Sequence, residues 1–151
     1  MIKTMKRKKD RWSVPADAEF VKSNGHGAMN PTITPNGDRI YFHTTRKSEN
    51  KTKTGIWYVD RMADSWSEAR YLHSEFNQQV SDLDVHPVTG GHLYYGASIK
   101  TGFGKHDIYR SRFHNGKLEP GINIGSIINT AENDSCTVAS DESYMRLVQK
   151  K

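Results

Sequence analysis

Three side chains with ligand chemistry alternate along one short stretch of the chain. Asp82, Asp84 and His86 are each separated by a single residue, so an extended strand would place all three on one face. Two carboxylates and an imidazole can coordinate a divalent cation. The alternative is a row of solvated polar side chains on the first strand of a repeat unit. The matching stretch of the preceding unit, which begins at Asn30, has no such ligands, so the sequence predicts no metal site and no cofactor.

Four of the residues named above remain candidates for contacting a ligand, namely Asn30, Asp82, Asp84 and His86. We predict no catalytic residue. The seven histidines fall in no HExxH frame, and the glycine pairs at 25–27 and 102–104 lack the third glycine of a dinucleotide-binding loop. The sequence also has no GxSxG motif. Asp107 directly precedes an expected strand and is expected to accept hydrogen bonds that stabilise a turn.

Aromatic residues are concentrated in the expected strands. They could form a stacking surface for a sugar or a peptide, but large aromatic side chains on strands also supply core packing between sheets. The residues concerned are Trp57, Tyr58, Tyr94, Tyr95 and Tyr109. The single cysteine, Cys136, excludes an intrachain disulfide, and its place in an expected strand predicts a small packing residue.

The positive charge of the protein lies almost entirely at one end. Of the 22 Lys and Arg, six fall within residues 1–11, which hold only one of the 17 Asp and Glu. The remaining sequence is therefore close to neutral. Basic arms can bind polyanions, but terminal segments are commonly disordered. The sequence thus predicts a disordered basic tail over residues 1–11 and no nucleic-acid partner.

The hydropathy of the sequence indicates whether any segment could cross a membrane. No apolar run reaches the roughly 18 residues of a membrane span, and no apolar stretch follows the basic residues as in a signal peptide. We therefore expect no membrane span and no signal peptide in this sequence. The mean hydropathy is −0.79 and 34% of the residues are hydrophobic, which suits short strands better than a large helical core.

A four-strand pattern repeats along the sequence. The first copy has expected strands at 31–34, 39–44, 56–59 and 66–72, and the second at 83–86, 92–97, 107–111 and 117–124. The Pro-Asn-Gly segment at 35–37 is typical of a tight turn between two strands. Anchor residues recur 52 residues apart, as in Ile56 and Ile108, while two tryptophans are 54 apart. Units of this size are typical of propeller blades, so we predict an all-β fold.

Three segments of the repeat resemble a known family. PTITPNGDRIYF (31–42), GKHDIYRS (104–111) and DESY (141–144) resemble the WD40-like PD40 repeats of TolB-type β-propellers. The resemblance implies a partial β-propeller of about two and a half four-stranded antiparallel blades over residues 12–151. The blades would lie at about 28–77, 80–129 and 132–151, after a strand of a preceding blade at 12–20. In the third copy, Arg146 falls where a buried strand residue is expected.

The resemblance also implies a function. Repeats of this family are mostly found in bacterial proteins that are periplasmic or exported, where they serve as interaction surfaces. The compartment of this protein is left open. We expect a non-catalytic scaffold that binds a protein or peptide, either by itself or as a fragment of a longer TolB-like protein. The alternative is a propeller enzyme, or part of one, of the glycosidase or peptidase type with carboxylates at its channel. Because closed propellers typically have about 4–8 blades, self-association could also complete the ring.

Overall fold

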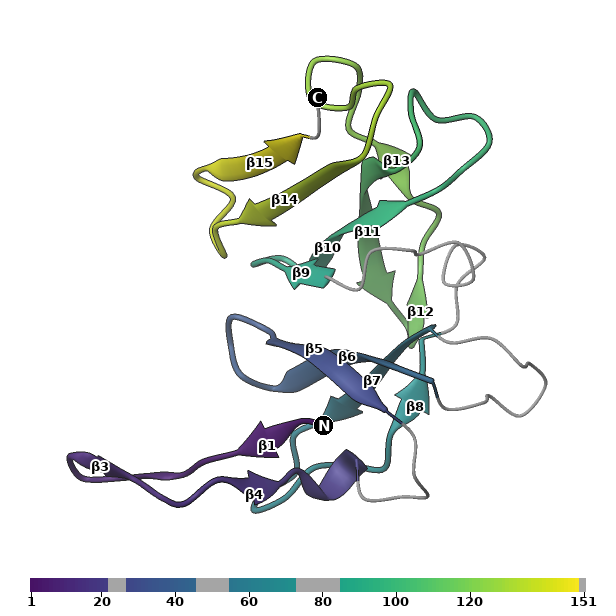
Figure 1. Cartoon of the computed structure of the whole chain (residues 1–151). Helices are drawn as coiled ribbons and strands as arrows, with labels where there is room; N and C mark the ends of the chain where they lie inside the picture. Colours follow the sequence, from purple (N-terminus) through teal and green to yellow (C-terminus); the bar gives the residue numbers. More distant parts are fainter. Residues whose placement is uncertain (22–26, 46–54, 73–84, 150–151) are drawn as a thin grey trace.

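Antiparallel sheets make up the whole architecture. The computed structural model describes residues 1–21, 27–45, 55–72 and 85–149. Over these ranges the sheets follow one another in sequence order and none closes on itself (Figure 1). The one helical element in the described ranges is a single 3₁₀ turn, η1 (Glu19–Val21). The described residues include no helix long and apolar enough to cross a membrane. The predicted all-β fold is therefore confirmed.

Sheet I is a four-stranded meander in which each strand pairs with the next. Its strands are β5 (Ala28–Ile33), β6 (Arg39–Thr44), β7 (Gly55–Asp60) and β8 (Arg70–Tyr71). The turn between β5 and β6 is closed by the Thr34 N–H, which donates to the Arg39 carbonyl at 2.9 Å. Gly37 in this turn has φ +73°, a conformation that glycine adopts without the steric cost of a side chain. The observed fourth strand, β8, is much shorter than the strand predicted at 66–72.

Sheet II repeats the meander. It contains β9 (Val85–Pro87), β10 (His92–Ala97), β11 (Asp107–His114), β12 (Lys117–Leu118) and β13 (Ile122–Asn123). Both β12 and β13 pair with β11. Sheet III is a single hairpin of β14 (Asp134–Val138) and β15 (Met145–Gln149). Arg146 is exposed on β15, so the expected burial at this position is wrong, because no further strand among the described residues covers it.

Equivalent hydrogen bonds recur at the repeat interval. The Leu72 N–H donates to the Ile56 carbonyl at 3.0 Å, and one repeat later the Ile124 N–H donates to the Ile108 carbonyl at 3.2 Å. The same bond also occurs one repeat earlier, where the Ala18 N–H donates to the carbonyl of Ile2 at 3.2 Å. The repeat is therefore a repeat of backbone geometry, and it extends to the start of the sequence.

The N-terminal unit, residues 1–21, has the hydrogen bonding of the second half of sheet I. β1 (Lys3–Thr4) pairs with β4 (Ala16–Asp17), and β2 (Arg7–Lys8) pairs with β3 (Arg11–Trp12). Each of these pairings recurs one repeat later, in β7 with β8 and in the bridge between Arg61 and Trp66. The structure thus differs from the predicted disordered tail. The basic residues occupy the solvated hairpin of a folded unit, in which Ile2, Ala18 and Phe20 are buried.

Three apolar clusters join these units face to face. Alternation along each strand sends Phe42 and Trp57 toward the N-terminal unit, and Tyr41 and Tyr58 toward sheet II. A third cluster packs sheet II against sheet III, and Cys136 is among its partly buried members. The aromatic residues on the strands are therefore part of the core. This agrees with the interpretation that they supply packing between sheets, and not with a stacking surface for a ligand. Burial raises the pKa of the Cys136 thiol to about 12, which fits its predicted packing role.

The packing of the N-terminal unit can be tested by truncating Phe20. This ring is 8% exposed and lies 5.4 Å from the ring of Phe42 and 6.3 Å from that of Trp66, between centroids. We expect Phe20→Ala to lower the free energy of unfolding by about 3–5 kcal/mol, measured by urea denaturation. Val14→Ala is the matched control, because Val14 is 86% exposed, and it should change stability by less than about 0.5 kcal/mol. Equal stability of the two variants would show that residues 1–21 do not pack on sheet I.

Candidate functional site

The predicted ligand-contacting residues are described only in part. Asp82 and Asp84 lie outside the described residues. Asn30 lies on β5 at an irregularity in the register with β6, is exposed, and has φ +51°, a conformation that Asn tolerates better than most residues. His86 is half-buried on β9 opposite Tyr94. β5 and β9 are neighbours, so the structure places Asn30 and His86 on adjacent first strands.

Histidine and carboxylate side chains do not gather into a metal centre in the described part of the protein. No group of three or more His, Cys, Asp or Glu lies close enough there to hold an ion. His43 is buried in sheet I, and burial lowers its pKa. His106 Nδ1 lies 2.6 Å from Asn133 Oδ1, between sheets II and III.

Asp107 has the structural role expected of it. Its side chain is 1% exposed and accepts hydrogen bonds from the Phe103 N–H at 2.6 Å and the Gly104 N–H at 3.0 Å. Asn123 Nδ2 donates to the same carboxylate at 2.7 Å, and Asn129 Nδ2 donates to Asn123 Oδ1 at 2.7 Å. Because these bonds all lead to loop or neighbouring amide groups, the network fixes the end of sheet II.

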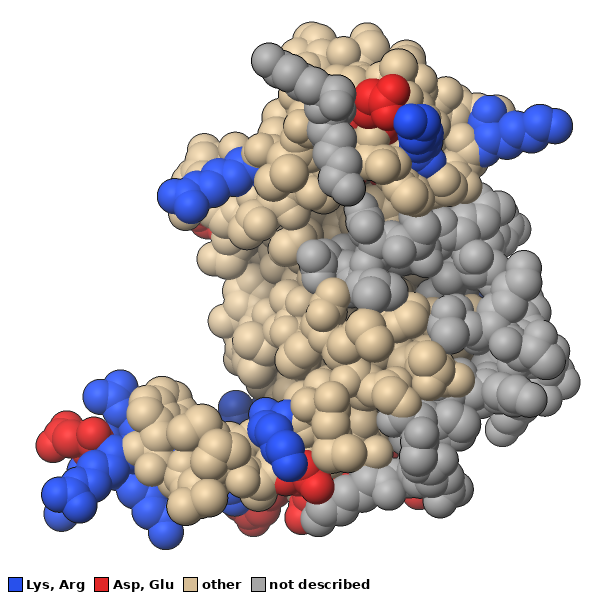
Figure 2. Space-filling view, in the orientation of Figure 1, with Lys and Arg blue, Asp and Glu red and all other residues tan. Residues whose placement is uncertain are grey.

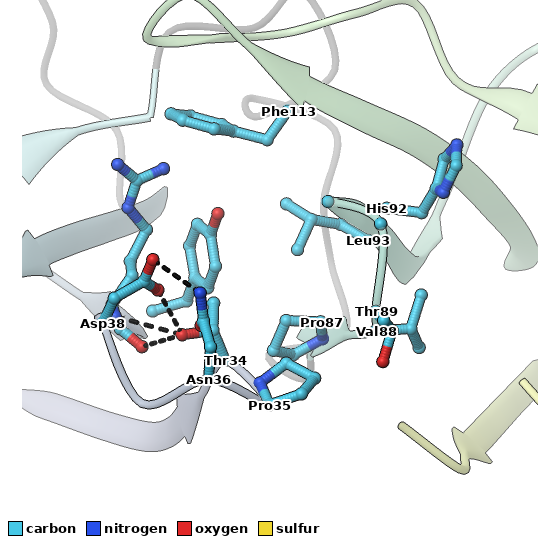
Figure 3. Close-up of a pocket in the computed structure, with 14 residues that line it drawn as sticks. Thr34, Pro35, Asn36, Asp38, Pro87, Val88, Thr89, His92, Leu93 and Phe113 are labelled. Carbon is cyan, nitrogen blue, oxygen red and sulfur yellow. Dashed lines mark hydrogen bonds between the residues drawn. The ribbon is translucent and has the colours of Figure 1, made fainter. Parts of the chain in front are cut away.

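A pocket of about 330 Å³ lies between the turns of sheets I and II. Figure 3 shows the Thr34–Asp38 turn on one side of it, Leu93 and His92 on the other, and Phe113 across the opening. This volume is at the lower end of the roughly 300–1,000 Å³ typical of ligand pockets. The 14 lining residues are Thr34, Pro35, Asn36, Asp38, Arg39, Tyr41, Pro87, Val88, Thr89, Gly90, Gly91, His92, Leu93 and Phe113.

Arg39 is held in place at the wall of this pocket by both charge and aromatic rings. Its Nε donates to Asp60 Oδ1 at 2.6 Å, and its Cζ lies 4.1 Å from the ring centroid of Phe113 and 4.5 Å from that of Tyr58. Stacking over aromatic faces stabilises a guanidinium. Since the ion pair uses Nε and the Tyr41 hydroxyl is a further partner of the guanidinium, only the remaining N–H groups of Arg39 are donors that a ligand could meet.

Two further hydrogen-bond donors line the pocket. Burial raises the pKa of the Tyr41 hydroxyl, although the hydrogen bond with Arg39 opposes this shift, so the hydroxyl keeps its proton at neutral pH. His92 Nδ1 lies 3.2 Å from Arg110 Nη2. A guanidinium can only donate, so His92 accepts at Nδ1 and bears its proton on Nε2.

The rim has one carboxylate whose oxygens are already engaged. Asp38 Oδ1 accepts from the Thr34 hydroxyl at 2.7 Å, and Asp38 Oδ2 accepts from Asn36 Nδ2 at 2.8 Å. These bonds stabilise the turn between β5 and β6 and are drawn as dashed lines in Figure 3. The pocket therefore combines apolar walls with a few fixed polar groups, an arrangement that gives a binding site its specificity.

The equivalent gap between sheets II and III is filled by the protein itself. The Tyr94 hydroxyl donates to Glu142 Oε1 at 2.7 Å, and Arg110 Nε donates to the same oxygen at 3.0 Å. The Thr89 N–H donates to the Ser140 carbonyl at 2.7 Å. The turn of sheet III thus closes against sheet II through one carboxylate and one backbone bond.

A second surface feature is the charge on the N-terminal unit. Figure 2 shows Lys and Arg side chains gathered on the projecting β2–β3 hairpin. Side chains of Arg7, Lys8 and Arg11 belong to its two strands and are exposed. These residues are solvated, and none of the buried polar side chains of the described ranges lies on this hairpin.

Sequence reasoning did not identify the pocket. The turn at 35–37 was explained by fold alone, Arg39 and Tyr41 lay in the segment 31–42 that indicated only the repeat, and His92 stood in no motif. The available signal was the paired glycines at 90–91, which depart from the turn of the first copy. Nothing local indicates that the two turns, which are separated by a whole repeat of the sequence, meet in space.

The contact between sheets II and III predicts a measurable titration. The hydrogen bond from Tyr94, followed by that from Arg110, lowers the pKa of Glu142 from its usual 4.5. Tyr94→Phe should raise this pKa toward 4.5, observed by carbon-detected NMR titration of the Glu142 carboxyl. Tyr144→Phe, at a side chain 62% exposed, is the control and should leave it unchanged.

The sign of the pH effect on stability follows from the same contact. The pKa of Glu142 is lower in the folded state than its usual 4.5. Its contact with Tyr94 and Arg110 therefore stabilises the folded protein above about pH 4.5, and this stabilisation is lost as the pH falls through the lowered pKa. An unshifted Glu142 pKa in the wild-type protein would contradict the contact.

No protein-family model, no curated protein and no solved structure matches this sequence. The functional interpretation therefore depends on the geometry of the pocket and on the internal repetition of the fold.

Proposed function

We propose that this protein is a non-catalytic module of the β-propeller type, with blades related to PD40 repeats, and that it binds a protein or peptide. Four-stranded antiparallel meanders that recur at a regular interval and stack face to face support the propeller assignment. On this interpretation, sheets I, II and III are successive blades and the N-terminal unit is the second half of a preceding one.

The observation that carries the binding role is the pocket between sheets I and II. It is open at the turn edge of two successive sheets, where exposed backbone and the side chains of Asn36 and Thr89 border it. Its donors belong to Arg39, Tyr41 and His92, while its apolar surface comes from proline, leucine and phenylalanine side chains. An extended peptide presents the complementary groups, namely carbonyl or carboxylate acceptors and small apolar side chains.

The proposed binding role is tested by obstructing the pocket mouth. A phage-displayed library of random 12-residue peptides would be selected on the whole protein, and the enriched peptides measured by fluorescence polarisation. Asn36→Trp places a bulky ring at the rim, so binding of the enriched peptides should weaken at least tenfold. Ser65→Trp makes the same change at the exposed turn after β7, away from the pocket, and should bind like the wild type.

Thermal unfolding of both tryptophan variants would establish that each is folded. Failure to enrich any peptide, or equal binding by Asn36→Trp and Ser65→Trp, would overturn a peptide-binding role for this pocket.

A further inference from the structure

The turns that join the first two strands of sheets I, II and III have one backbone position in common. Each turn is closed by a bond to the carbonyl of Arg39, His92 or Tyr144, and the residue two positions earlier has positive φ. Counted back from the closing carbonyl, the three residues and their φ values are Gly37 at +73°, Gly90 at +87° and Glu142 at +59°. Only the third of these has a side chain that can reach the preceding sheet. The turn of sheet II is one residue shorter than the other two, and its next residue, Gly91, also has positive φ, at +81°.

Glu142 shows what that position does when it bears a side chain. Its carboxylate meets Tyr94, the third residue of β10, and Arg110, which lies directly opposite Tyr94 on β11. Arg110 Nη2 is 2.9 Å from Glu142 Oε1, in addition to the bond from Nε. The preceding sheet thus offers a tyrosine hydroxyl and a guanidinium, and the following turn supplies the carboxylate.

Sheet I offers the same two groups to the turn of sheet II. Tyr41 is the third residue of β6, as Tyr94 is of β10, and the residue opposite it on β7 is Tyr58. The cation comes from Arg39, whose Cζ lies 4.5 Å from the Tyr58 ring centroid and 5.9 Å from that of Tyr41. The turn of sheet II presents Gly90 at the position of Glu142, and Gly90 lines the pocket.

Several charged side chains lie at or near the pocket. Asp60 pairs with both Arg39 and Arg70, and Arg61 Nη1 lies 3.7 Å from the point where a Cβ on Gly37 would be. Of these charged side chains, only Arg39 and Asp38 line the pocket. Arg39 is paired with Asp60, as Arg110 is paired with Glu142.

We infer that the pocket between sheets I and II binds a carboxylate of a peptide ligand, held by the Tyr41 hydroxyl and the Arg39 guanidinium in the way that Tyr94 and Arg110 hold Glu142. This inference rests on the proposed peptide-binding function and specifies its ligand. An acidic side chain and the free carboxyl end of a peptide present the same carboxylate chemistry, and the two are separated by the probes.

The first experiment uses capped pentapeptides and amide NMR of the whole protein. Ac-Gly-Gly-Glu-Gly-Gly-amide is compared with the same peptide carrying Gln, and Ac-Gly₅ with a free carboxylate is compared with its amide. Shifts of the Gly90, Gly91 and His92 amides should saturate with one or both carboxylate peptides and be at least fivefold weaker with the neutral partner. Tyr41→Phe should lose this preference, whereas Tyr144→Phe should retain it.

The second experiment supplies the carboxylate from the protein. Gly90→Glu and Gly90→Gln place side chains of equal size and equal backbone strain at φ +87°, and the added Cβ would meet His92 Nδ1 at an ordinary 3.7 Å. At pH 7 the Glu variant should melt at higher temperature than the Gln variant, and the difference should vanish below about pH 4, where the carboxylate is protonated. Gly90→Glu should also no longer respond to the carboxylate peptide.

The outcomes separate this inference from the proposed function. Equal shifts with charged and neutral peptides, or equal melting of the two Gly90 variants at pH 7, would overturn carboxylate recognition. Library peptides that bind the wild type and lose affinity in Asn36→Trp would in that case still support a peptide pocket with another specificity.

Discussion

Burial of both faces of the central strands is the constraint on which the rest of this structure depends. β6, β7, β10 and β11 each lie between two neighbouring units, so successive side chains along them must fill two different interfaces. A sequence with only 34% hydrophobic residues meets this demand with large rings, such as Tyr41 and Phe42 on opposite faces of one strand. Each sheet therefore depends on its neighbours, because an isolated meander would leave one aromatic face in water.

The same constraint explains why the turns matter for function. Face-to-face stacking brings the first turn of each sheet beside the next, so the gap between them is shaped by residues far apart in the sequence. Between sheets II and III the backbone of Thr89 and Ser140 closes the gap. Between sheets I and II it remains as the pocket. One stacking geometry thus yields a sealed contact in one place and a cavity in another, and the residues of the turn decide which.

Much of the fold could be predicted because its signals are local. The turn at 35–37, the β-prone run 56–59 and the regular recurrence of anchor residues indicated the meanders that sheets I and II contain. In the N-terminal unit, the equivalent spacing of Trp12 and Trp66 supported an expected strand at 12–20. Residues 1–11 were not expected to be folded, because their hairpin is basic and only a few residues of the unit, such as Ile2 and Phe20, reach the core. The pocket could not be predicted, since contact between Arg39 and the turn of sheet II arises from stacking and leaves no local pattern.

Glu142 provides an energetic argument about these turns. A side chain in the left-handed region costs roughly 1–2 kcal/mol relative to glycine, yet Glu142 adopts φ +59° at a position where the other two turns have glycine. Hydrogen bonds to a charged group contribute about 1.5–3 kcal/mol each where they are shielded from water, and less at a partly exposed site. The bonds from Tyr94 and Arg110 act against this strain. At Gly90 that strain is absent, and the turn of sheet II has no carboxylate at this position, so Arg39 is paired with Asp60 of its own sheet and not with the following turn.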